Sequence, residues 1–536
     1  MPAIPSTSAA TTMAVDTTGV ECAQPAMLPI AVCEQARLSR DARFDGLFFT
    51  AVRTTGIYCR PICPAPTPHA RNVRYFPNAA SAEAAGYRPC LRCRPELSPA
   101  AGAGRRGDDV VARASRMIDD GALDAAGIEA LAARLHVGPR HLRRLFVDTL
   151  GTSPRQLQNT RRLLFAKQLL AETTLPITDV ALAAGFNSLR RFNDAFLHAY
   201  GLAPTRLRRK QGPVAARPRQ ALVLRLAYRP PFDFHASLAF LRTRALPGVE
   251  AVAAGTYRRL LDATGAWLQV EAWGGDEPAL RLSLHGVAAA ALPRIVQRVR
   301  RMFDLDADPQ AIHAHLRHDP RLRALLDRHP GLRLPGGWDG FEVAIRAVLG
   351  QQVSVAAAST LATRLLARCG SDLPNPTDDA LRRLFPAPEV LAEADLAGIG
   401  LTGARSATLR ALARAVCDQR LRFDPAQPLD AFVAACCALP GIGDWTAHYL
   451  ALRALGHPDA FPAGDLVLRK QVGGGVPISE KQLRLHAEHW RPWRGYAAIQ
   501  LWHAASAGSA SAHPAVAARH PRTQATGPTA SHGDRT

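Results

Sequence analysis

Four cysteines stand in two close pairs near one end of the 536-residue chain. Three residues separate Cys59 from Cys63, two separate Cys90 from Cys93, and 26 lie between the pairs. Four thiolates at this spacing can close a tetrahedral zinc site. The spacing alone leaves two interpretations open. One is a purely structural zinc knuckle; the other is a reactive cysteine, because zinc keeps a thiolate deprotonated near neutral pH.

The residues around the cysteines favour the second interpretation. The runs RDARFDG at 40–46, TTGIYCRP at 54–61 and GYRPCLRCRP at 86–95 closely resemble the amino-terminal zinc domain of the Ada family of methylation-damage sensors. The resemblance covers about residues 35 to 97. It implies one Zn²⁺ held by all four cysteines and a methyl group transferred once from a DNA methylphosphotriester to Cys59. Methylation removes one negative charge, which weakens repulsion from DNA phosphates, so we expect the transfer to act as a switch.

A second candidate for chemistry is a carboxylate that follows a glycine-rich turn. The segment LPGIGDWTA at 439–447 joins two helical patterns, and Asp465 follows Gly443 by 22 residues. Glycine in a hairpin lets backbone N–H groups approach a phosphate closely, although many glycine turns merely end a helix. An ionised aspartate beside such a hairpin can stabilise the sugar cation that forms when a flipped base leaves. The pairing therefore favours base excision.

Two further motifs point to the same chemistry. With GQQVS at 350–354 and WRPWRGYA at 490–497, the hairpin resembles the 3-methyladenine DNA glycosylase II (AlkA) family of helix-hairpin-helix enzymes over about residues 220 to 505. The resemblance implies that Asp465 is the catalytic carboxylate, that Gly441 and Gly443 grip the DNA backbone, that a monovalent cation sits on hairpin carbonyls and that water is the nucleophile. Gln352 is the expected DNA contact where the best-known relative has an apolar wedge.

Aromatic side chains near the hairpin are candidates for the base pocket. Purines alkylated at N3 or N7 are cationic, and electron-rich rings attract them by stacking and cation–π interaction. We expect Trp445, Tyr449 and Trp493 to line the pocket; the alternative for each is ordinary helix core. Trp445 stands where lyase members of the superfamily carry a Schiff-base lysine, so we expect a monofunctional DNA-3-methyladenine glycosylase.

The middle of the chain carries the strongest positive charge. Residues 105–220 contain 20 Lys plus Arg against 10 Asp plus Glu, so they hold +10 of the net charge of +21, and DNA should dock there. Segments 128–151 and 177–201 repeat at an offset of 50 residues and resemble the two helix-turn-helix halves of the AraC-type DNA-binding domain. For any single arginine the alternative is a phosphate contact or a solvated charge. The candidate base contacts are Arg140, Arg143, Arg144, Ser188, Arg190, Arg191 and Asn193.

These segments define a multidomain α+β chain. Apolar residues make up 47% and charged residues 21%, which are ordinary globular values, and stretches rich in Pro, Gly and Ala at about 98–107 and 211–220 are the expected linkers. The predicted divisions are a disordered tail (1–34), a small zinc-bound α/β domain (35–97), an all-α double helix-turn-helix domain (108–210), a strand-rich α+β subdomain (220–335), an all-α helix-hairpin-helix glycosylase domain (336–505) and a disordered tail (506–536).

The expected function is a combined response to DNA alkylation: methyl acceptance, transcriptional activation switched by the methyl group, and excision of alkylated purines. The alternative is a transcription regulator whose glycosylase-like half binds DNA but is catalytically silent. Expected partners are double-stranded DNA, both alkylated and promoter, and RNA polymerase. No stretch approaches the 18 or so consecutive apolar residues of a membrane span, so we expect a cytoplasmic protein. We also expect it to be a monomer and to associate with the nucleoid. A methyltransferase centre for O6-alkylguanine is not expected, because the one Pro-Cys pair is Pro89-Cys90.

Overall fold

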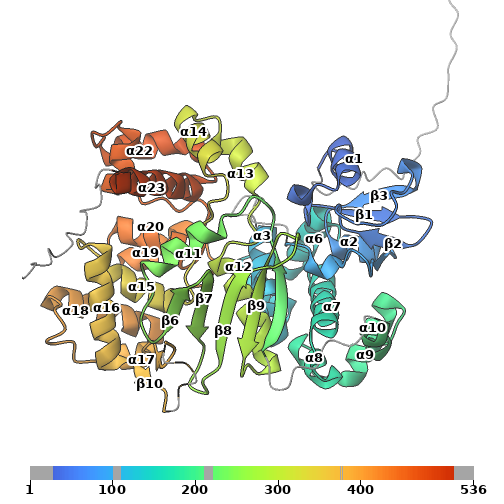
Figure 1. The fold of residues 1–536 in the computed structure, drawn as a ribbon, viewed down its shortest axis with the longest axis horizontal. Coiled ribbons are helices and arrows are strands. Elements are labelled where there is room, and N and C mark those ends of the chain that lie inside the picture. Colours follow the sequence, from blue (N-terminus) through green and yellow to red (C-terminus); the bar gives the residue numbers. More distant parts are fainter. Residues whose placement is uncertain are drawn as a thin grey trace, which may run out of the picture.

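The computed structural model describes residues 28–100, 110–210, 221–374, 376, 378 and 380–511. The zinc and helix-turn-helix domains form one side of the molecule, the larger sheet lies in the middle, and the second helical domain forms the other side (Figure 1). The expected linkers and tails lie largely outside the described residues. Within those residues, no helix is long and apolar enough to cross a membrane.

A four-stranded sheet organises the zinc domain. Its strand order is β3-β1-β2-β4, and β2 and β4 run parallel, whereas the other neighbours are antiparallel. The predicted tail boundary at residue 34 is wrong, because helix α1 begins at Ile30 and buries Cys33 completely against Phe48. The elements are α1 (Ile30–Ser39), β1 (Phe49–Val52), β2 (Ile57–Cys59), β3 (Val73–Phe76), α2 (Ala79–Ala84) and β4 (Arg88–Pro89).

All regular secondary structure in the described residues of the helix-turn-helix domain is helical. The sequence repeat at an offset of 50 residues corresponds to a repeat in the structure. Leu142 and Phe146 of one half are fully buried, and so are their counterparts Phe192 and Phe196. Both second helices end at a glycine with positive φ, 66° at Gly151 and 65° at Gly201, a conformation that favours glycine. The helices are α3 (Val110–Asp119), α4 (Ala122–Ala125), α5 (Ile128–Arg134), α6 (Pro139–Leu150), α7 (Pro154–Glu172), α8 (Ile177–Ala183), α9 (Leu189–Tyr200) and α10 (Pro204–Lys210).

An antiparallel sheet of order β5-β9-β8-β7-β6 forms the strand-rich subdomain. Strands β5, β8 and β9 confirm the predicted period of two. Strands β6 and β7 were not predicted, because the charged residues Glu250 and Arg259 interrupt the apolar alternation of the sequence. Both residues are buried, and Arg259 pairs with Glu250 and with Glu342. The elements are β5 (Leu222–Ala227), α11 (Phe234–Arg242), β6 (Glu250–Ala253), β7 (Thr256–Leu260), β8 (Trp267–Ala272), β9 (Ala279–His285) and α12 (Leu292–Met302).

The second helical domain has one large core, and its borders differ from the prediction. Helices α13 and α14 precede residue 336, yet Ile312 and Leu326 belong to this core, and α23 continues past residue 505. The elements are α13 (Pro309–Leu316), α14 (Pro320–Arg328), α15 (Gly340–Leu349), α16 (Val355–Cys369), β10 (Ser371–Asp372), β11 (Arg383–Leu384), α17 (Pro388–Glu393), α18 (Gly403–Cys417), α19 (Leu429–Cys437), α20 (Asp444–Arg453), α21 (Leu466–Val472), α22 (Glu480–Ala487) and α23 (Arg494–Ser511).

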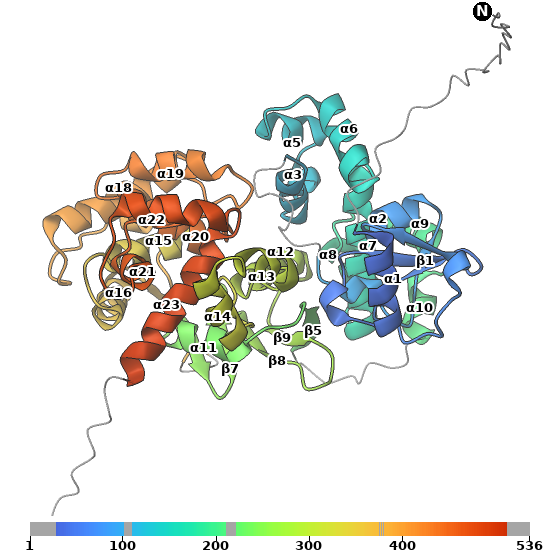
Figure 2. The ribbon, with the colours of Figure 1, turned by 90° about the horizontal axis from the view of Figure 1, so that it is seen from above.

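The two halves of the chain share packing. One hydrophobic cluster contains α8 and α9 residues together with residues of the strand-rich sheet. From above, α3 and α5 lie between the zinc domain and the second helical domain (Figure 2). There Arg134 pairs with Asp424 at 2.5 Å and Arg113 Nε donates to the Ala426 carbonyl at 2.7 Å. The helix-turn-helix domain therefore packs against the strand-rich sheet through α8 and α9 and contacts the second helical domain through α3 and α5.

A buried ion pair fastens the zinc domain to α7 and allows a stability prediction. Lys167 Nζ lies 2.7 Å from Glu96 Oε2 with both side chains fully buried, and it also donates to the Cys90 carbonyl at 3.1 Å. We expect Lys167→Ala to destabilise the protein by about 3 kcal/mol, because Glu96 loses a buried counter-charge. Chemical denaturation with zinc present measures the effect. The exposed pair Arg414–Glu393 supplies the control, since Arg414→Ala should change stability by less than about 1 kcal/mol. Equal losses of stability in the two variants would contradict the role assigned to Lys167.

Candidate functional sites

The four cysteines meet at the ends of two paired strands. Strand β2 ends at Cys59, and Cys90 follows β4; the parallel pairing brings them together, with the Cys90 N–H donating to the Tyr58 carbonyl at 2.9 Å. All four sulfurs lie within 4.8 Å of one another. A tetrahedral zinc ion with four Zn–S bonds of about 2.3 Å needs sulfurs about 3.8 Å apart. The donor set and its spacing therefore fit Zn²⁺, and the chain binds one zinc ion through these cysteines.

The sulfurs perturb one another. A hydrogen bond with Cys59 lowers the pKa of Cys63 to about 7, whereas the hydrogen bonds with Cys63 and Cys90 raise the pKa of Cys59. The four thiols thus cannot all ionise without a cation among them, which is what a bound zinc ion supplies. Cys90 and Cys93 are buried, and Cys59 and Cys63 are partly exposed. Exposure is compatible with methyl acceptance at Cys59 without distinguishing it from Cys63.

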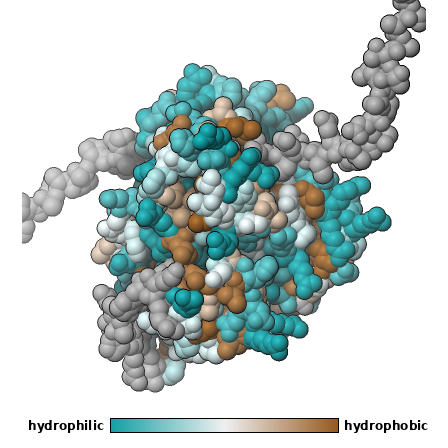
Figure 3. All heavy atoms as spheres, turned by 90° about the vertical axis from the view of Figure 1, so that its right-hand side faces the viewer, coloured by the Kyte–Doolittle hydropathy of each residue, from teal (hydrophilic) through white to brown (hydrophobic). Residues whose placement is uncertain are grey.

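The two helix-turn-helix halves present matching exposed faces. Residues at positions i, i+3, i+4 and i+7 of α6 are exposed, including Arg140, Arg143 and Arg144, and the same positions of α9 include Arg190 and Asn193. The described surface at this end of the molecule is mostly hydrophilic (Figure 3), as a nucleic-acid interface requires. A recognition helix reads base edges from such a face. The candidates on both helices are therefore accessible.

The second helix carries less free charge than the first. Each helix has one arginine near a carboxylate, because Arg143 lies 3.7 Å from Glu129 and Arg190 lies 4.0 Å from Asp194. Asp194 stands where the first helix has Arg144. Ser188 is partly buried, and its hydroxyl accepts a hydrogen bond from the Arg191 N–H at 3.4 Å, so its role in this structure is to cap α9. Arg191 is exposed. The charge difference makes α6 the stronger candidate for electrostatic docking.

The two glycines of the hairpin between α19 and α20 have different surroundings. A Cβ atom on Gly441, at φ +80°, would lie 2.2 Å from the Thr408 hydroxyl, so this position requires glycine for packing. Nothing lies within 4 Å of a Cβ position on Gly443, which leaves its backbone open to a phosphate. The Gly441 carbonyl accepts a hydrogen bond from Gln351 at 3.0 Å. The structure therefore ties the GQQVS loop to the hairpin.

Gln352 occupies a strained and exposed position in that loop. Its φ is +57°, which a residue other than glycine adopts at a cost of about 1 kcal/mol or more. Its neighbour Gln351 also donates to the Thr446 hydroxyl at 3.1 Å, and Gln351's carbonyl accepts from Arg405 at 2.7 Å. These contacts attach the loop to the hairpin, to α20 and to α18, and Gln352 is exposed beside them.

Three N–H groups fix the carboxylate of Asp465 at the start of α21. Its Oδ1 accepts from the Leu468 N–H at 3.0 Å and from Trp502 Nε1 at 3.1 Å, and its Oδ2 accepts from Trp445 Nε1 at 3.0 Å. The carboxylate is therefore held in one orientation by donors from three separate elements of the chain.

Aromatic rings surround this carboxylate. Trp445 stacks on Tyr449 with ring centroids 5.3 Å apart, and Tyr449 meets Trp502 edge-on at 6.5 Å. Trp493, predicted for the pocket, is placed elsewhere: it is 5% exposed and packs against Tyr496 in the helical core. Trp502 lies nine residues further along the chain, on α23, and takes the place beside Asp465. Only its residue type could have suggested it from the sequence.

The strand-rich subdomain contacts this aromatic cluster through Arg453, whose guanidinium lies over the rings of both Phe240 and Tyr449. Helix α11 supplies Phe240, whose ring lies below the guanidinium groups of Arg244 at 3.8 Å and of Arg453 at 4.4 Å. Burial raises the pKa of Tyr449, but the charges of Arg453, Arg244 and Arg346 outweigh it and lower that pKa. Sequence patterns did not link Phe240 or Arg244 to Asp465, because both residues belong to the strand-rich subdomain.

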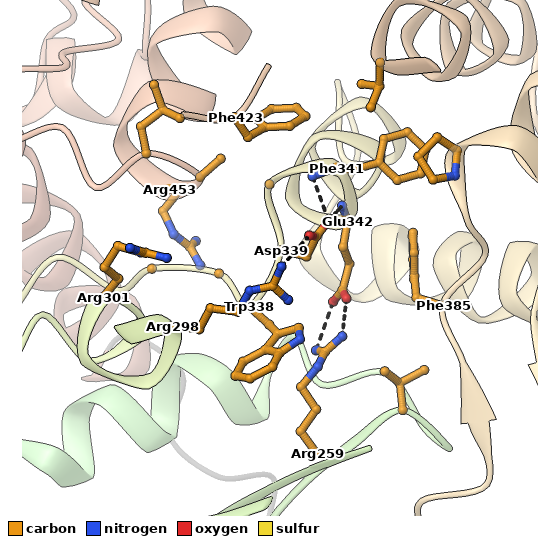
Figure 4. Close-up of a pocket in the computed structure, with 18 of the residues that line it drawn as sticks. Arg259, Arg298, Arg301, Trp338, Asp339, Phe341, Glu342, Phe385, Phe423 and Arg453 are labelled. Carbon is orange, nitrogen blue, oxygen red and sulfur yellow. Dashed lines mark hydrogen bonds and ion pairs between the residues drawn. The ribbon is translucent and has the colours of Figure 1, made fainter. Parts of the chain in front are cut away.

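A cavity of about 430 Å³ lies at the junction of the two subdomains, away from Asp465. Arg259 points at Glu342 and Arg298 points at Asp339, with Trp338 between the two arginines (Figure 4). Arg453 reaches from this cavity to the Tyr449 hydroxyl at 3.1 Å. Ion pairs therefore join the subdomains around this cavity, and Asp465 is not among the residues that line it.

Family models match four consecutive parts of the chain. They are the metal-binding domain of Ada (residues 32–96), a helix-turn-helix domain (131–210), the AlkA N-terminal domain (223–339) and the HhH-GPD superfamily of base-excision DNA repair proteins (345–491). Their order agrees with the domains expected from the sequence.

Curated relatives match the whole chain and its parts. A Mycobacterium tuberculosis protein, "Probable bifunctional transcriptional activator/DNA repair enzyme AlkA", is 43% identical over 484 residues, which cover 88% of this chain and 95% of that protein. Escherichia coli DNA-3-methyladenine glycosylase 2 is 36% identical over 52% of this chain and 96% of its own. Escherichia coli Ada, "Bifunctional transcriptional activator/DNA repair enzyme Ada", is 40% identical over 28% of this chain and 41% of its own. With its zinc site, paired DNA-reading helices and hairpin-bound aspartate, the chain belongs to the family of bifunctional transcriptional activators and DNA repair enzymes.

Proposed function

We propose that the carboxy-terminal half is a monofunctional glycosylase that hydrolyses the N-glycosidic bond of alkylated purines such as 3-methyladenine. The single observation that carries the proposal is Asp465, oriented by Trp445, Trp502 and a backbone N–H beside an open hairpin. The carboxylate stabilises the developing sugar cation and orients the water molecule that attacks it. Trp445 fills the position from which a lysine would form a Schiff base, so strand cleavage does not accompany base release.

The hairpin and the GQQVS loop hold the DNA during this step. The open backbone at Gly443 grips a phosphate, Gly441 packs the hairpin, and Gln352 fills the space left by the flipped nucleotide. Hairpin carbonyls that the Gln351 side chain does not occupy bind a monovalent cation. Trp445, Tyr449 and Trp502 stack on the extruded base.

At the other end, we propose that Cys59 is the methyl acceptor. A zinc ion bound by Cys59, Cys63, Cys90 and Cys93 keeps the sulfurs as thiolates. The Cys59 sulfur forms a bond to the methyl carbon, the carbon–oxygen bond breaks, and the phosphate leaves as a diester anion. A negative charge thus moves from protein to DNA. The less negative zinc domain then tolerates DNA phosphates better, so that α6 and α9 bind promoter DNA.

The full protein acts in these proposals as a monomer associated with the nucleoid, and it recruits RNA polymerase once methylated. The alternative, a regulator with a silent glycosylase half, is disfavoured by the fixed orientation of the Asp465 carboxylate. A silent pocket would need no such constraint.

The first test measures release of 3-methyladenine and 7-methylguanine from alkylated DNA at fixed salt. We expect Asp465→Asn to lower the rate by at least about 100-fold while DNA binding persists, because the transition-state cation loses its counter-charge. Asp444, which pairs with Arg484 at 2.7 Å beside the hairpin, provides the control, and Asp444→Asn should retain release. Absence of release by the unmodified protein would support the regulator-only alternative.

A matched pair of tryptophan variants tests the pocket. Trp502→Phe keeps an aromatic ring but removes the N–H that holds Asp465 Oδ1, so we expect kcat to fall about tenfold or more through misorientation. Trp493→Phe, in the core beside Tyr496, should leave kcat within about twofold at a temperature where both variants are folded. Single-turnover kinetics separate this effect from product release. Equal losses in both variants would exclude a specific role for Trp502.

Methyl acceptance is tested by mass spectrometry of the intact zinc-loaded protein after incubation with DNA containing methylphosphotriesters. We expect one added methyl group on the unmodified protein, mapped by peptide analysis to Cys59, and none on Cys59→Ser. Base release from alkylated DNA by Cys59→Ser should continue, because Asp465 lies in another domain. A methyl group found on Cys63 instead would overturn the assignment.

A further inference from the structure

Arg229 connects the strand-rich subdomain to the zinc domain through an unusual set of contacts. It follows β5, and its residue exposure is 0%. Its Nε donates to the Asp45 carbonyl at 2.8 Å, and one terminal nitrogen donates to the carbonyls of Asp306 at 2.9 Å and Ala307 at 3.1 Å. The other terminal nitrogen donates to the carbonyls of Pro99, at 3.3 Å, and Ala100. All five N–H donors of the guanidinium are thereby used.

This arrangement is specific to arginine. A guanidinium presents five N–H donors in a rigid plane, whereas a lysine ammonium has three donors around one point. A cation taken fully out of water must be hydrogen-bonded to remain charged, and here backbone carbonyls supply every partner. One of the five carbonyls belongs to the zinc domain, two belong to residues 99 and 100 directly after it, and two belong to the turn after α12. The side chain therefore bridges two domains.

The contact on the zinc side leads directly to the metal site. The carboxylate of Asp45, the residue whose carbonyl binds Arg229, pairs with the Arg60 guanidinium and accepts from Ser98 Oγ at 3.1 Å. Arg60 follows Cys59 in the chain. Its guanidinium donates to the Cys93 carbonyl at 3.0 Å, and its backbone N–H lies 3.3 Å from Cys93 Sγ. A buried path of contacts thus runs from Arg229 to two of the four cysteines.

The turns around Arg229 are closely packed. Gly46, at φ +76°, packs so closely that a Cβ atom would lie 2.0 Å from the Pro99 carbonyl oxygen. On the opposite side, Asp306 Oδ1 accepts from the Ala100 N–H at 3.0 Å and pairs with Arg300. The two domains therefore exchange hydrogen bonds in both directions around Arg229.

We propose that Arg229 docks the zinc domain on the strand-rich subdomain and is a positioning residue for the metal site, through Asp45 and Arg60. The glycosylase half thereby supports the methyl-acceptor site. Coupling between sites is reciprocal, so the loss of zinc loosens the turn at residues 304–308. The inference rests on zinc binding by the four cysteines and is independent of glycosylase activity.

The experiment uses the full-length, zinc-loaded protein and measures the rate of zinc release to a chromogenic chelator. Loss of an outer contact to metal ligands typically weakens metal binding by 10- to 100-fold; for a residue one step further out, we expect Arg229→Met to release zinc about tenfold faster. Arg229→Lys should not rescue the rate. The control is Arg259→Met: Arg259 is also buried in the strand-rich subdomain, but its ion pairs are with Glu250, at 3.2 Å, and with Glu342, both outside the zinc domain.

Hydrogen–deuterium exchange supplies a second readout. Chelation of zinc should raise exchange at residues 304–308 in the unmodified protein, whereas Arg229→Met should show raised exchange there with zinc bound. If Arg229→Met does not fold, Gly46→Ala disturbs the same contact from the zinc side and should accelerate zinc release.

Two results would overturn the proposal. Zinc release and exchange that match the unmodified protein in a folded Arg229→Met or Gly46→Ala would show that the contact has no influence on the metal site. Acceleration by Arg259→Met equal to that by Arg229→Met would assign the effect to general destabilisation of the strand-rich subdomain. In both cases zinc binding by the cysteines and base release at Asp465 would stand.

Discussion

Buried cations satisfied by carboxylates or backbone carbonyls hold this multidomain chain together. Lys167 joins the zinc domain to α7, Arg229 joins it to the strand-rich subdomain, and Arg259 and Arg453 join that subdomain to the second helical domain. Removing such a charge from water is costly unless its partners are correctly placed. Each junction therefore specifies one arrangement of its two neighbours.

The same chain uses arginine in two opposite ways. On α6 and α9 the guanidinium groups are exposed, so they are available to phosphates and base edges, whereas at the junctions they are enclosed. The 66 Lys and Arg residues therefore include both exposed cations on these helices and enclosed cations at the domain junctions. Overall charge indicated a polyanionic partner, but it could not separate these two populations, because burial depends on packing between segments far apart in the sequence.

The two reactive sites follow a common principle of preorganisation. Strand pairing brings the cysteines together, and three N–H donors hold Asp465 in its orientation without DNA. Fixed dipoles and donors avoid reorganisation during reaction. Holding these groups in place requires some unfavourable backbone conformations, such as the positive φ of Gln352 in the loop beside the hairpin.

The sequence by itself determined the four cysteines, the hairpin with its aspartate, the paired DNA-reading helices and the domain order. These features are local, because ligand spacing, glycine turns and helical periods depend on residues close together in the chain. Tertiary structure decided what depends on distant contacts. It placed Trp502 instead of Trp493 beside Asp465, formed β6 and β7 around buried charges, assigned α13 and α14 to the helical core, and enclosed Arg229 between two domains. A one-dimensional pattern cannot show these outcomes, because each one requires two or more segments to meet before any of them is stable.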